Sequence, residues 1–132
     1  MNRLLLLMVT ASSLFISASA RYSESDLAQS QSNYGAIAYS PSSDVYGTSW
    51  NYSSRQQAEA RAFRECQSRS VNNDCTVVTW FRNACGALAT TPNNAYGGNW
   101  GNSLIAAERN ALEMCSQYGK NCTVLTSLCA DR

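Results

Sequence analysis

The chain contains Gly35-Ala36-Ile37-Ala38 and, a few residues later, Tyr46-Gly47-Thr48-Ser49-Trp50. The same pattern returns as Gly86-Ala87-Leu88-Ala89, followed by Tyr96-Gly97-Gly98-Asn99-Trp100. Similarity at a fixed period of about fifty residues indicates a duplicated supersecondary unit. We therefore predict one pseudo-symmetric domain over residues 34–132, with repeat one at 34–84 and repeat two at 85–129.

Each repeat is expected to begin with a β-hairpin. In repeat one, two strand-like stretches, 34–40 and 45–51, flank the turn sequence Pro41-Ser42-Ser43-Asp44. Side chains alternate along a strand, so Ala36 and Ala38 share one face while Ile37 lies on the other. Small residues on one face predict that a helix lies close to that face.

A helix and a third strand are expected to follow each hairpin. Ser54 begins a capping box, and an apolar stripe at helical spacing runs from there to Cys66. The second helix is expected to start near Ser103. The stretches 76–81 and 123–128 are β-branched and apolar, which is typical of inner strands. We predict an α+β fold of two hairpin-helix-strand repeats, an antiparallel-rich sheet with two helices on one face.

The first twenty residues have the pattern of a secretory signal peptide. Arg3 precedes an apolar run, and Ala18-Ser19-Ala20 forms a small-x-small cleavage site. The apolar run is shorter than the roughly 20 residues needed to span a bilayer. We expect residues 1–20 to be removed and residues 21–33 to form a flexible leader. The protein is expected to be exported, periplasmic or secreted, without a membrane anchor.

The charge balance lacks the signature of a nucleic-acid or membrane partner. The chain has 10 Lys and Arg, 9 Asp and Glu, and no His. Loss of Arg3 with the signal peptide leaves a formal charge of zero and no basic block. We therefore expect no nucleic-acid binding and no electrostatic binding to membranes.

Six cysteines in a short exported chain predict three disulfides. The repeat restricts the pairing, because matched cysteines are expected to pair in matched ways. The local set is Cys66–Cys75 and Cys115–Cys122, with Cys85–Cys129 joining the two halves. The crossed set, Cys66–Cys122 with Cys75–Cys115, is also symmetric and stays an alternative. The Cys spacings differ from those of zinc sites and the chain has no His, so no metal or other cofactor is expected.

With these motifs placed, a family resemblance can be named. The region from about Tyr34 to Cys129 resembles the bacterial secreted family called domain of unknown function 4189. The matching pieces are 34–40, 46–50, the Ala-rich helix ending at Cys66, 80–89, 96–101 and the closing helix with Cys115, Cys122 and Cys129. The resemblance implies an exported bacterial domain, and it supplies no catalytic residues.

Two aromatic pairs are candidates for a binding surface. Tyr46 and Trp50 lie four apart on a strand and so share a face, and Tyr96 and Trp100 repeat the arrangement. The glycine that follows each Tyr is expected to leave room beside the ring. The functional hypothesis is a pair of platforms that stack sugars, peptide stems or a partner side chain. The alternative is that these residues fill the core beneath the helices.

The junction between the repeats is the second candidate. The stretch Trp80-Phe81-Arg82-Asn83 differs from the Ser127-Leu128-Cys129 of repeat two, so it is unique to the junction. An exposed Trp-Phe-Arg triplet would form a hot spot of the kind found in protein interfaces. The alternative is an ordinary strand end, with Trp80 buried and Arg82 in solvent.

No catalytic set is recognisable in the sequence. Without His there is no Ser-His or Cys-His nucleophile pair, and no carboxylate pair is singled out by its spacing. We therefore expect a small non-enzymatic binding protein, an inhibitor or immunity-type protein that binds a toxin or an enzyme of the bacterial envelope. Binding to cell-wall glycan is the alternative, and an enzyme of unrecognised type is the lesser one.

Overall fold

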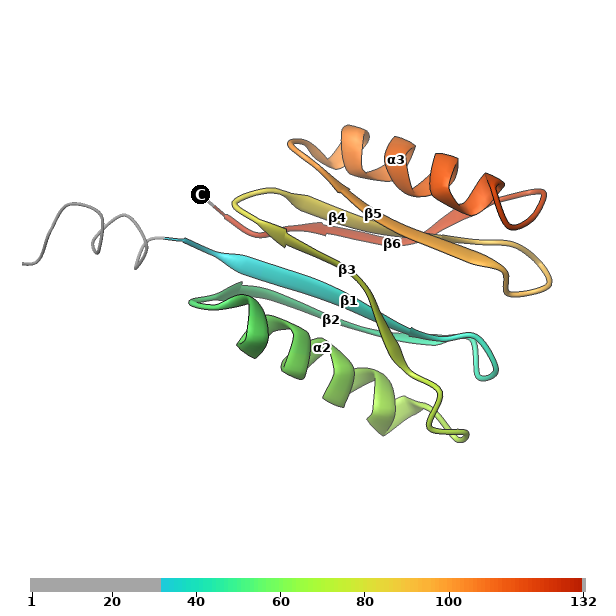
Figure 1. Ribbon diagram of the computed structural model, residues 1–132, viewed down its shortest axis with the longest axis horizontal. Helices are drawn as coiled ribbons and strands as arrows, with labels where there is room; N and C mark the ends of the chain where they lie inside the picture. The colour runs from blue at the N-terminus through green and yellow to red at the C-terminus, as the bar shows by residue number, and fades with distance from the viewer. Residues whose placement is uncertain (1–31, 132) are drawn as a thin grey trace, which may run out of the picture.

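The computed structural model describes residues 32–131. These residues form six strands and two helices (Figure 1). In chain order the elements are β1 (Tyr34–Ser40), β2 (Val45–Tyr52), α2 (Arg55–Arg69), β3 (Thr76–Arg82), β4 (Cys85–Thr90), β5 (Tyr96–Gly101), α3 (Leu104–Ser116) and β6 (Thr123–Cys129). The predicted signal peptide, 1–20, and most of the predicted leader lie outside the described residues.

The strands form two antiparallel sheets of three, one from each repeat. The first sheet has the strand order β2-β1-β3 and the second has the order β5-β4-β6. The registers correspond, since Ala36 lies opposite Ser49 and its counterpart Ala87 lies opposite Asn99. The predicted α+β class and the pseudo-symmetric repeats are confirmed.

The two sheets pack face to face, and each carries its own helix on its outer face (Figure 1). α2 packs on β1, β2 and β3, while α3 packs on β4, β5 and β6. The layer order is therefore α2, first sheet, second sheet, α3. The prediction of a sheet with both helices on one face was wrong in this respect. Each repeat has its own small-residue face, and the two large-residue faces bury each other.

Side-chain size explains the layering. Ala36 and Ala38 of β1 pack with Ala58 and Ala62 of α2, and alanines at 87, 89, 107 and 111 do the same in repeat two. The opposite faces of β1 and β4 carry Ile37, Tyr39 and Leu88, which fill the space between the sheets. Small residues let each helix approach its sheet, and the large residues bury most of the apolar surface in the middle layer.

Gly47 and Gly97 make room for helix backbone rather than for an aromatic ring. A Cβ at Gly47 would lie 2.1 Å from the Ala62 carbonyl oxygen, and one at Gly97 would lie 2.2 Å from the Cys115 nitrogen. The expectation of free space beside the Tyr rings was therefore wrong. Neighbouring positions of a strand face opposite ways, so these glycines face the helix while the preceding Tyr faces the other sheet.

The structure contains the local set of disulfides, Cys66–Cys75, Cys85–Cys129 and Cys115–Cys122. Cys66–Cys75 and Cys115–Cys122 each tie the end of a helix to the start of the next strand. Cys85 and Cys129 lie opposite each other on β4 and β6. This bridge does not join the two halves as expected, because both of its cysteines belong to the second sheet.

Ser32 and Asn33 belong to the folded domain rather than to a flexible leader. Ser32 is only 2% exposed, and the Asn33 backbone nitrogen donates to Asn83 Oδ1 at 2.9 Å. The Asn33 side chain also donates to the Asp131 carbonyl, which brings the two ends of the described chain together. The contacts of Ser32 and Asn33 therefore tie these two residues of the predicted leader to the domain, and its other residues lie outside the described part of the chain. Neither helix within residues 32–131 has the length and apolar character needed to cross a membrane.

Candidate functional site

Two exposed tryptophans stand at one end of the molecule. β2 and β5 end on the same side of the molecule (Figure 1). Trp50 and Trp100 lie near the ends of these strands. Trp50 is 55% exposed and Trp100 is 50% exposed. Both belong to the strand face opposite the helices, because the neighbouring Ser49 and Gly101 face α2 and α3. We use the name tryptophan end for four residues near the ends of β2, β3 and β5, which are Trp50, Trp80, Trp100 and Arg82. Trp80 and Arg82 face the α2 side of the first sheet, whereas Trp50 and Trp100 face away from the helices.

Tyr46 and Tyr96 share the strand faces of the tryptophans but have a different role. Both pack against the core between the sheets. The Tyr96 ring lies 5.3 Å from the Tyr39 ring in an edge-on arrangement. The predicted aromatic pairs are thus divided, since the Tyr rings support the core and the Trp rings remain in solvent.

Trp80 and Tyr34 lie side by side between two arginines, Arg55 and Arg82. The Arg55 guanidinium carbon lies 4.3 Å from the centre of the Trp80 ring, and Tyr34 flanks that ring at 6.3 Å. Arg82 lies 5.7 Å from the centre of the Tyr34 ring. Arg82 also donates to the Ser32 hydroxyl from Nε and Nη2, at 3.0 and 2.7 Å. These contacts fix Trp80, which keeps 36% of its surface exposed.

The expectation of an exposed Trp-Phe-Arg triplet was wrong for Phe81. Its side chain is 1% exposed and fills the core between the sheets, against Gly35 and Gly86. Alternation along β3 turns Trp80 and Arg82 outward and Phe81 inward. Asn83 has a structural position, because its backbone has a φ of 48° and it bonds to Asn33. The surface hypothesis is therefore narrowed to Trp80 and Arg82.

Trp50 stands between two shallow hollows. The first, of about 340 Å³, also contains Asn51, Arg61 and Glu65. The second, of about 290 Å³, contains Thr126 and Asp131 from the far repeat. An exposed indole flanked by such donors and acceptors can stack one face of a ring while the polar groups form hydrogen bonds.

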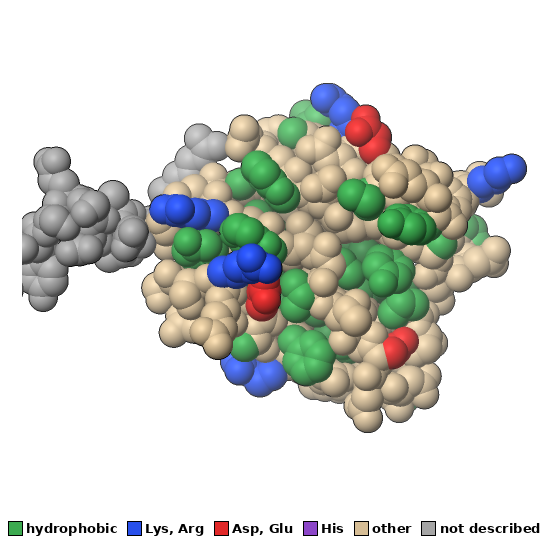
Figure 2. Space-filling view, in the orientation of Figure 1, with side chains coloured by type: hydrophobic (Ala, Val, Ile, Leu, Met, Phe, Trp, Pro, Cys, Tyr) green, Lys and Arg blue, Asp and Glu red, His purple; other side chains and the backbone are tan. Residues whose placement is uncertain are grey.

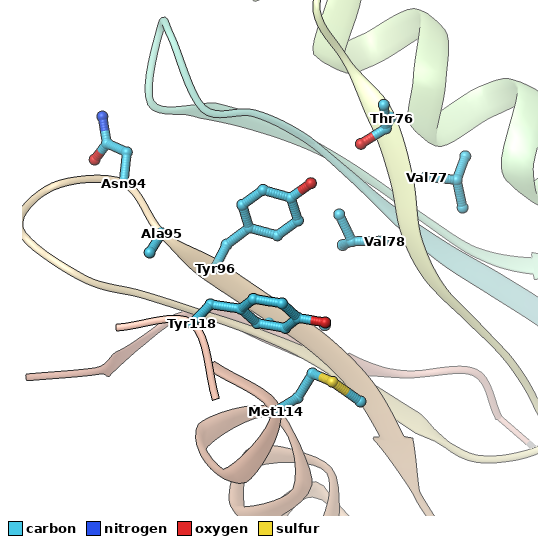
Figure 3. Close-up of a pocket in the computed structure, with 10 residues that line it drawn as sticks. Thr76, Val77, Val78, Asn94, Ala95, Tyr96, Met114 and Tyr118 are labelled. Atoms are coloured by element: carbon cyan, nitrogen blue, oxygen red, sulfur yellow. The ribbon is translucent and has the colours of Figure 1, made fainter. Parts of the chain in front are cut away.

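A larger groove of about 620 Å³ lies between the two repeats (Figure 3). Val78 projects into it from β3, while Tyr96 comes from β5, and Met114 and Tyr118 come from the end of α3 and the residues after it (Figure 3). The remaining lining residues are Thr76, Val77, Asn94, Ala95, Gly97 and Gly98. We call this hollow the inter-repeat groove. Its walls carry no ionisable acid or base other than the two tyrosines.

Two carboxylates lie near the inter-repeat groove, Asp44 in the β1–β2 turn and Asp74 in the loop before β3. Tyr39, which packs edge-on against Tyr96, donates to Asp44 Oδ1 at 2.7 Å. Burial and this hydrogen bond raise the pKa of Tyr39 well above its ordinary value. Asp74 accepts hydrogen bonds from the Ser40 hydroxyl and the Ser42 backbone nitrogen, which lower its pKa to about 2. The Asp74 carboxylate is therefore charged near neutral pH.

The described part of the chain has neither a metal-binding cluster nor a free thiol. Residues 32–131 contain no cluster of three His, Cys, Asp or Glu side chains that could hold a metal ion. All six cysteines are in disulfides and cannot act as nucleophiles. Hydrophobic side chains gather along the middle of one face, with few charged groups among them (Figure 2).

A family model described as Domain of unknown function (DUF4189) matches residues 34–129. The chain belongs to this family. The suspected resemblance is therefore confirmed, and the DUF4189 match begins at the first residue of β1 and ends at the last residue of β6.

Relatives of this DUF4189 chain occur in mycobacteria. It is 46% identical over 79 residues to Protein Mb1300c of Mycobacterium bovis and to Protein Rv1269c of Mycobacterium tuberculosis. The aligned region covers 60% of this chain and 58% of each relative, so the chain spans less than two thirds of their length. The NMR structure of Rv1813c from Mycobacterium tuberculosis is similar, with a TM-score of 0.53 and 28% identity over 74% of both chains. The fold is therefore shared over about three quarters of the chain.

Sequence reasoning found the tryptophans but missed the inter-repeat groove. Of the groove residues, Tyr96 alone was among the predicted candidates. The sequence does contain a signal for the groove, in the positions at which repeat two differs from repeat one. Gly98, Met114 and Tyr118 of repeat two stand where repeat one has Thr48, Glu65 and Arg69. The sequence comparison concentrated on residues that the two repeats share, so these differing positions were overlooked.

Proposed function

We propose that this DUF4189 chain is an exported, non-enzymatic protein that binds another protein through its tryptophan end. The specific form of the proposal is an inhibitor or immunity-type protein of the bacterial envelope. The observation that carries it is the pair Trp50 and Trp100, each about half exposed at equivalent positions of the two repeats. Trp and Arg are the residues most enriched at the energetic centres of protein interfaces.

The rigidity of the scaffold supports this proposal. Both tryptophans lie in strands, and Trp80 is held between Arg55 and Tyr34. Cys85–Cys129 crosslinks β4 and β6 beside them. A surface that is ordered before binding loses little conformational entropy when a partner arrives, so more of the contact energy appears as affinity.

Export is supported by the three disulfides and by the N-terminal pattern of residues 1–20. Disulfides persist in the periplasm and outside the cell, whereas cytosolic thiols are kept reduced. The test of export is N-terminal sequencing of the protein from envelope and culture-supernatant fractions. A mature terminus at Arg21 is expected, and an uncleaved cytosolic chain would contradict it.

The test of protein binding is affinity purification of the oxidised protein from envelope and supernatant extracts, followed by mass spectrometry. We expect one stoichiometric protein partner. The double variant Trp50→Ala/Trp100→Ala should weaken binding by about 30-fold or more, because a hot-spot residue contributes about 2 kcal/mol or more. The control is Val71→Ser, which changes an exposed apolar residue in the loop between α2 and β3. Equal recovery by both variants would contradict the proposal.

Glycan binding is the second candidate, and the two hollows beside Trp50 favour it. Asn51, Arg61 and Glu65 on one side and Asp131 on the other supply hydrogen-bonding groups around the indole. Sugar rings stack on such indoles through their apolar faces. Retention on insoluble cell wall that is lost in Trp50→Ala, without a protein partner, would favour this reading. Retention unchanged by Trp50→Ala would remove it.

A further inference from the structure

The inter-repeat groove is a second surface, separate from the tryptophan end. We propose that it binds an extended segment of a partner protein that carries lysine or arginine side chains. The proposal rests on the groove's own residues and does not require the tryptophan end to bind anything.

The groove exists because repeat two departs from repeat one. In repeat one, Glu65 and Arg69 form an ion pair at 3.2 Å, and Arg69 donates to the Tyr46 carbonyl at 3.0 Å. These polar contacts cover the equivalent face of β2. Met114 and Tyr118 stand at the matching positions of repeat two and make an apolar wall instead. The shared fold does not require this change, since repeat one forms the same elements without it.

The shape of the groove fits an extended segment. It runs between β3 and β5, which are edge strands of different sheets. Within residues 32–131, β3 is paired with β1 alone and β5 with β4 alone. Each therefore presents an unpaired strand edge, and an added segment can bond to such an edge through its main chain.

The carboxylates near the groove favour a segment that carries basic side chains. Asn94 of the groove donates to the Pro41 carbonyl at 2.9 Å, which fixes the groove next to the turn that carries Asp44. Asp74 holds the same turn from the other side, at the Ser42 nitrogen. Neither carboxylate forms an ion pair with a Lys or Arg among the described residues. Two carboxylates without an ion-pair partner favour a basic ligand.

The groove walls suit the rest of a basic side chain. The aliphatic stem of Lys or Arg packs well against Val78 and Met114, while the charged head reaches toward the carboxylates. The rings of Tyr96 and Tyr118 both project into the groove (Figure 3). Aromatic faces attract cations, so these rings and the nearby carboxylates favour the same charge.

The first experiment measures the binding of two labelled probe peptides to the oxidised protein. One is an alternating Lys-Val heptapeptide and the other is its Glu-Val counterpart. We expect the Lys-Val peptide to bind at least tenfold more tightly by fluorescence anisotropy. In two-dimensional NMR spectra of the protein, the amide shift changes caused by this peptide should centre on Val78, Tyr96 and Tyr118.

Two variants test whether the apolar wall and the nearby charge are responsible for peptide binding. Met114→Glu/Tyr118→Arg introduces the repeat-one ion pair and should weaken Lys-Val binding at least tenfold. Asp44→Asn keeps an acceptor for Tyr39 and suits the φ of 51° at this position, so it removes the charge alone and should weaken binding about threefold. Ile105→Ser, an exposed change in the first turn of α3, is the control. Asp44→Asn keeps the test decisive even if the double variant does not fold.

Several results would overturn the proposal. Equal affinity for the two peptides would remove the charge argument, and shift changes confined to Trp50 and Trp100 would place the contact elsewhere. Concentration-dependent dimerisation that is lost in the double variant would assign the groove to a second copy of the chain. Tighter binding of a peptide of residues 21–31 would assign it to the chain's own N-terminal segment. Because these probes are independent of the Trp variants, failure here leaves the proposed function untouched.

Discussion

Asparagine and aspartate, not glycine, supply the left-handed backbone positions among the described residues. The described non-glycine residues with positive φ are Asp44, Asn51, Asn73, Asn83, Asn94 and Asn121, whereas no described glycine has a positive φ. Asn and Asp tolerate this conformation because their short side chains bond to nearby backbone. The glycines have another purpose, which is to let neighbouring backbone or rings approach closely. Gly97 is a clear case, because a Cβ added there would lie 2.2 Å from the backbone of α3.

Replacing Gly97 with Ala is therefore expected to push α3 away from β5. Overpacking a buried site lowers the free energy of unfolding by about 1–3 kcal/mol. We expect a loss near the upper end of this range at Gly97, because the added methyl group would meet helix backbone, which cannot move aside as a side chain can. The midpoint of thermal unfolding should fall by roughly 10–20 °C. Trp100→Ala on the same strand is the control, because its side chain is exposed. Equal stability of Gly97→Ala and wild type, measured by circular dichroism, would show that the helix can shift at little cost.

Residue patterns predicted the faces of the strands well. The alternation of Ala36 and Ala38 with Ile37 identified the side that faces a helix, because burial against helix backbone needs small residues. The reason for Gly47 and Gly97 could not be predicted. The same glycine fits a tight backbone approach or a space beside a ring, and the three-dimensional contact alone distinguishes them.

At the scale of elements, a carboxylate holds the β1–β2 turn against the loop before β3. Asp74 bonds to Ser40 and to the Ser42 nitrogen, and it lies next to the crosslinked Cys75. This contact joins the hairpin to the end of the α2 segment. It also links the shape of the turn to the ionisation of a single side chain.

Stability is expected to decrease in acid through Asp74. Hydrogen bonds from Ser40 and Ser42 lower its folded-state pKa from 3.8 to about 2. A lowered pKa means that its stabilising effect is fully present above about pH 4 and is lost as pH falls toward 2. Asp74→Asn should therefore show a smaller fall in the unfolding midpoint between pH 5 and pH 2 than wild type. Parallel curves for the two proteins, recorded at constant ionic strength, would contradict this role.

The elements themselves were largely predictable, whereas their assembly was not. Ser54 and Ser103 cap α2 and α3 as the sequence indicates, and the predicted strand ranges differ from the observed ones by a residue or less. Sequence patterns within one strand or helix do not show whether the two repeats form one continuous sheet or two sheets packed face to face. The inter-repeat groove depends on that choice, because it lies where β3 of one sheet passes β5 of the other.

At the scale of the molecule, the disulfides differ in the length of chain they enclose. Cys85–Cys129 spans 44 residues, while Cys66–Cys75 spans 9 and Cys115–Cys122 spans 7. Closing a longer loop removes more entropy from the unfolded chain. The longest bridge is therefore expected to contribute the most stability.

Paired Cys→Ala variants test this order. Removing Cys85–Cys129 should cost about 4 kcal/mol, against about 2.5 kcal/mol for Cys115–Cys122. Urea unfolding of the two double variants, with wild type alongside, gives both free energies. A larger loss for the shorter bridge would mean that the crosslinks act on the folded state rather than on the unfolded chain.

The placement of these bridges leaves the two halves without a disulfide between them. Each half contains its own sheet, its own helix and its own covalent crosslinks, and the halves meet through side chains such as Ile37, Phe81 and Leu88. The direct peptide connection between them is the short segment Asn83–Ala84. The domain is therefore arranged like a homodimer whose two subunits are joined by a linker of two residues.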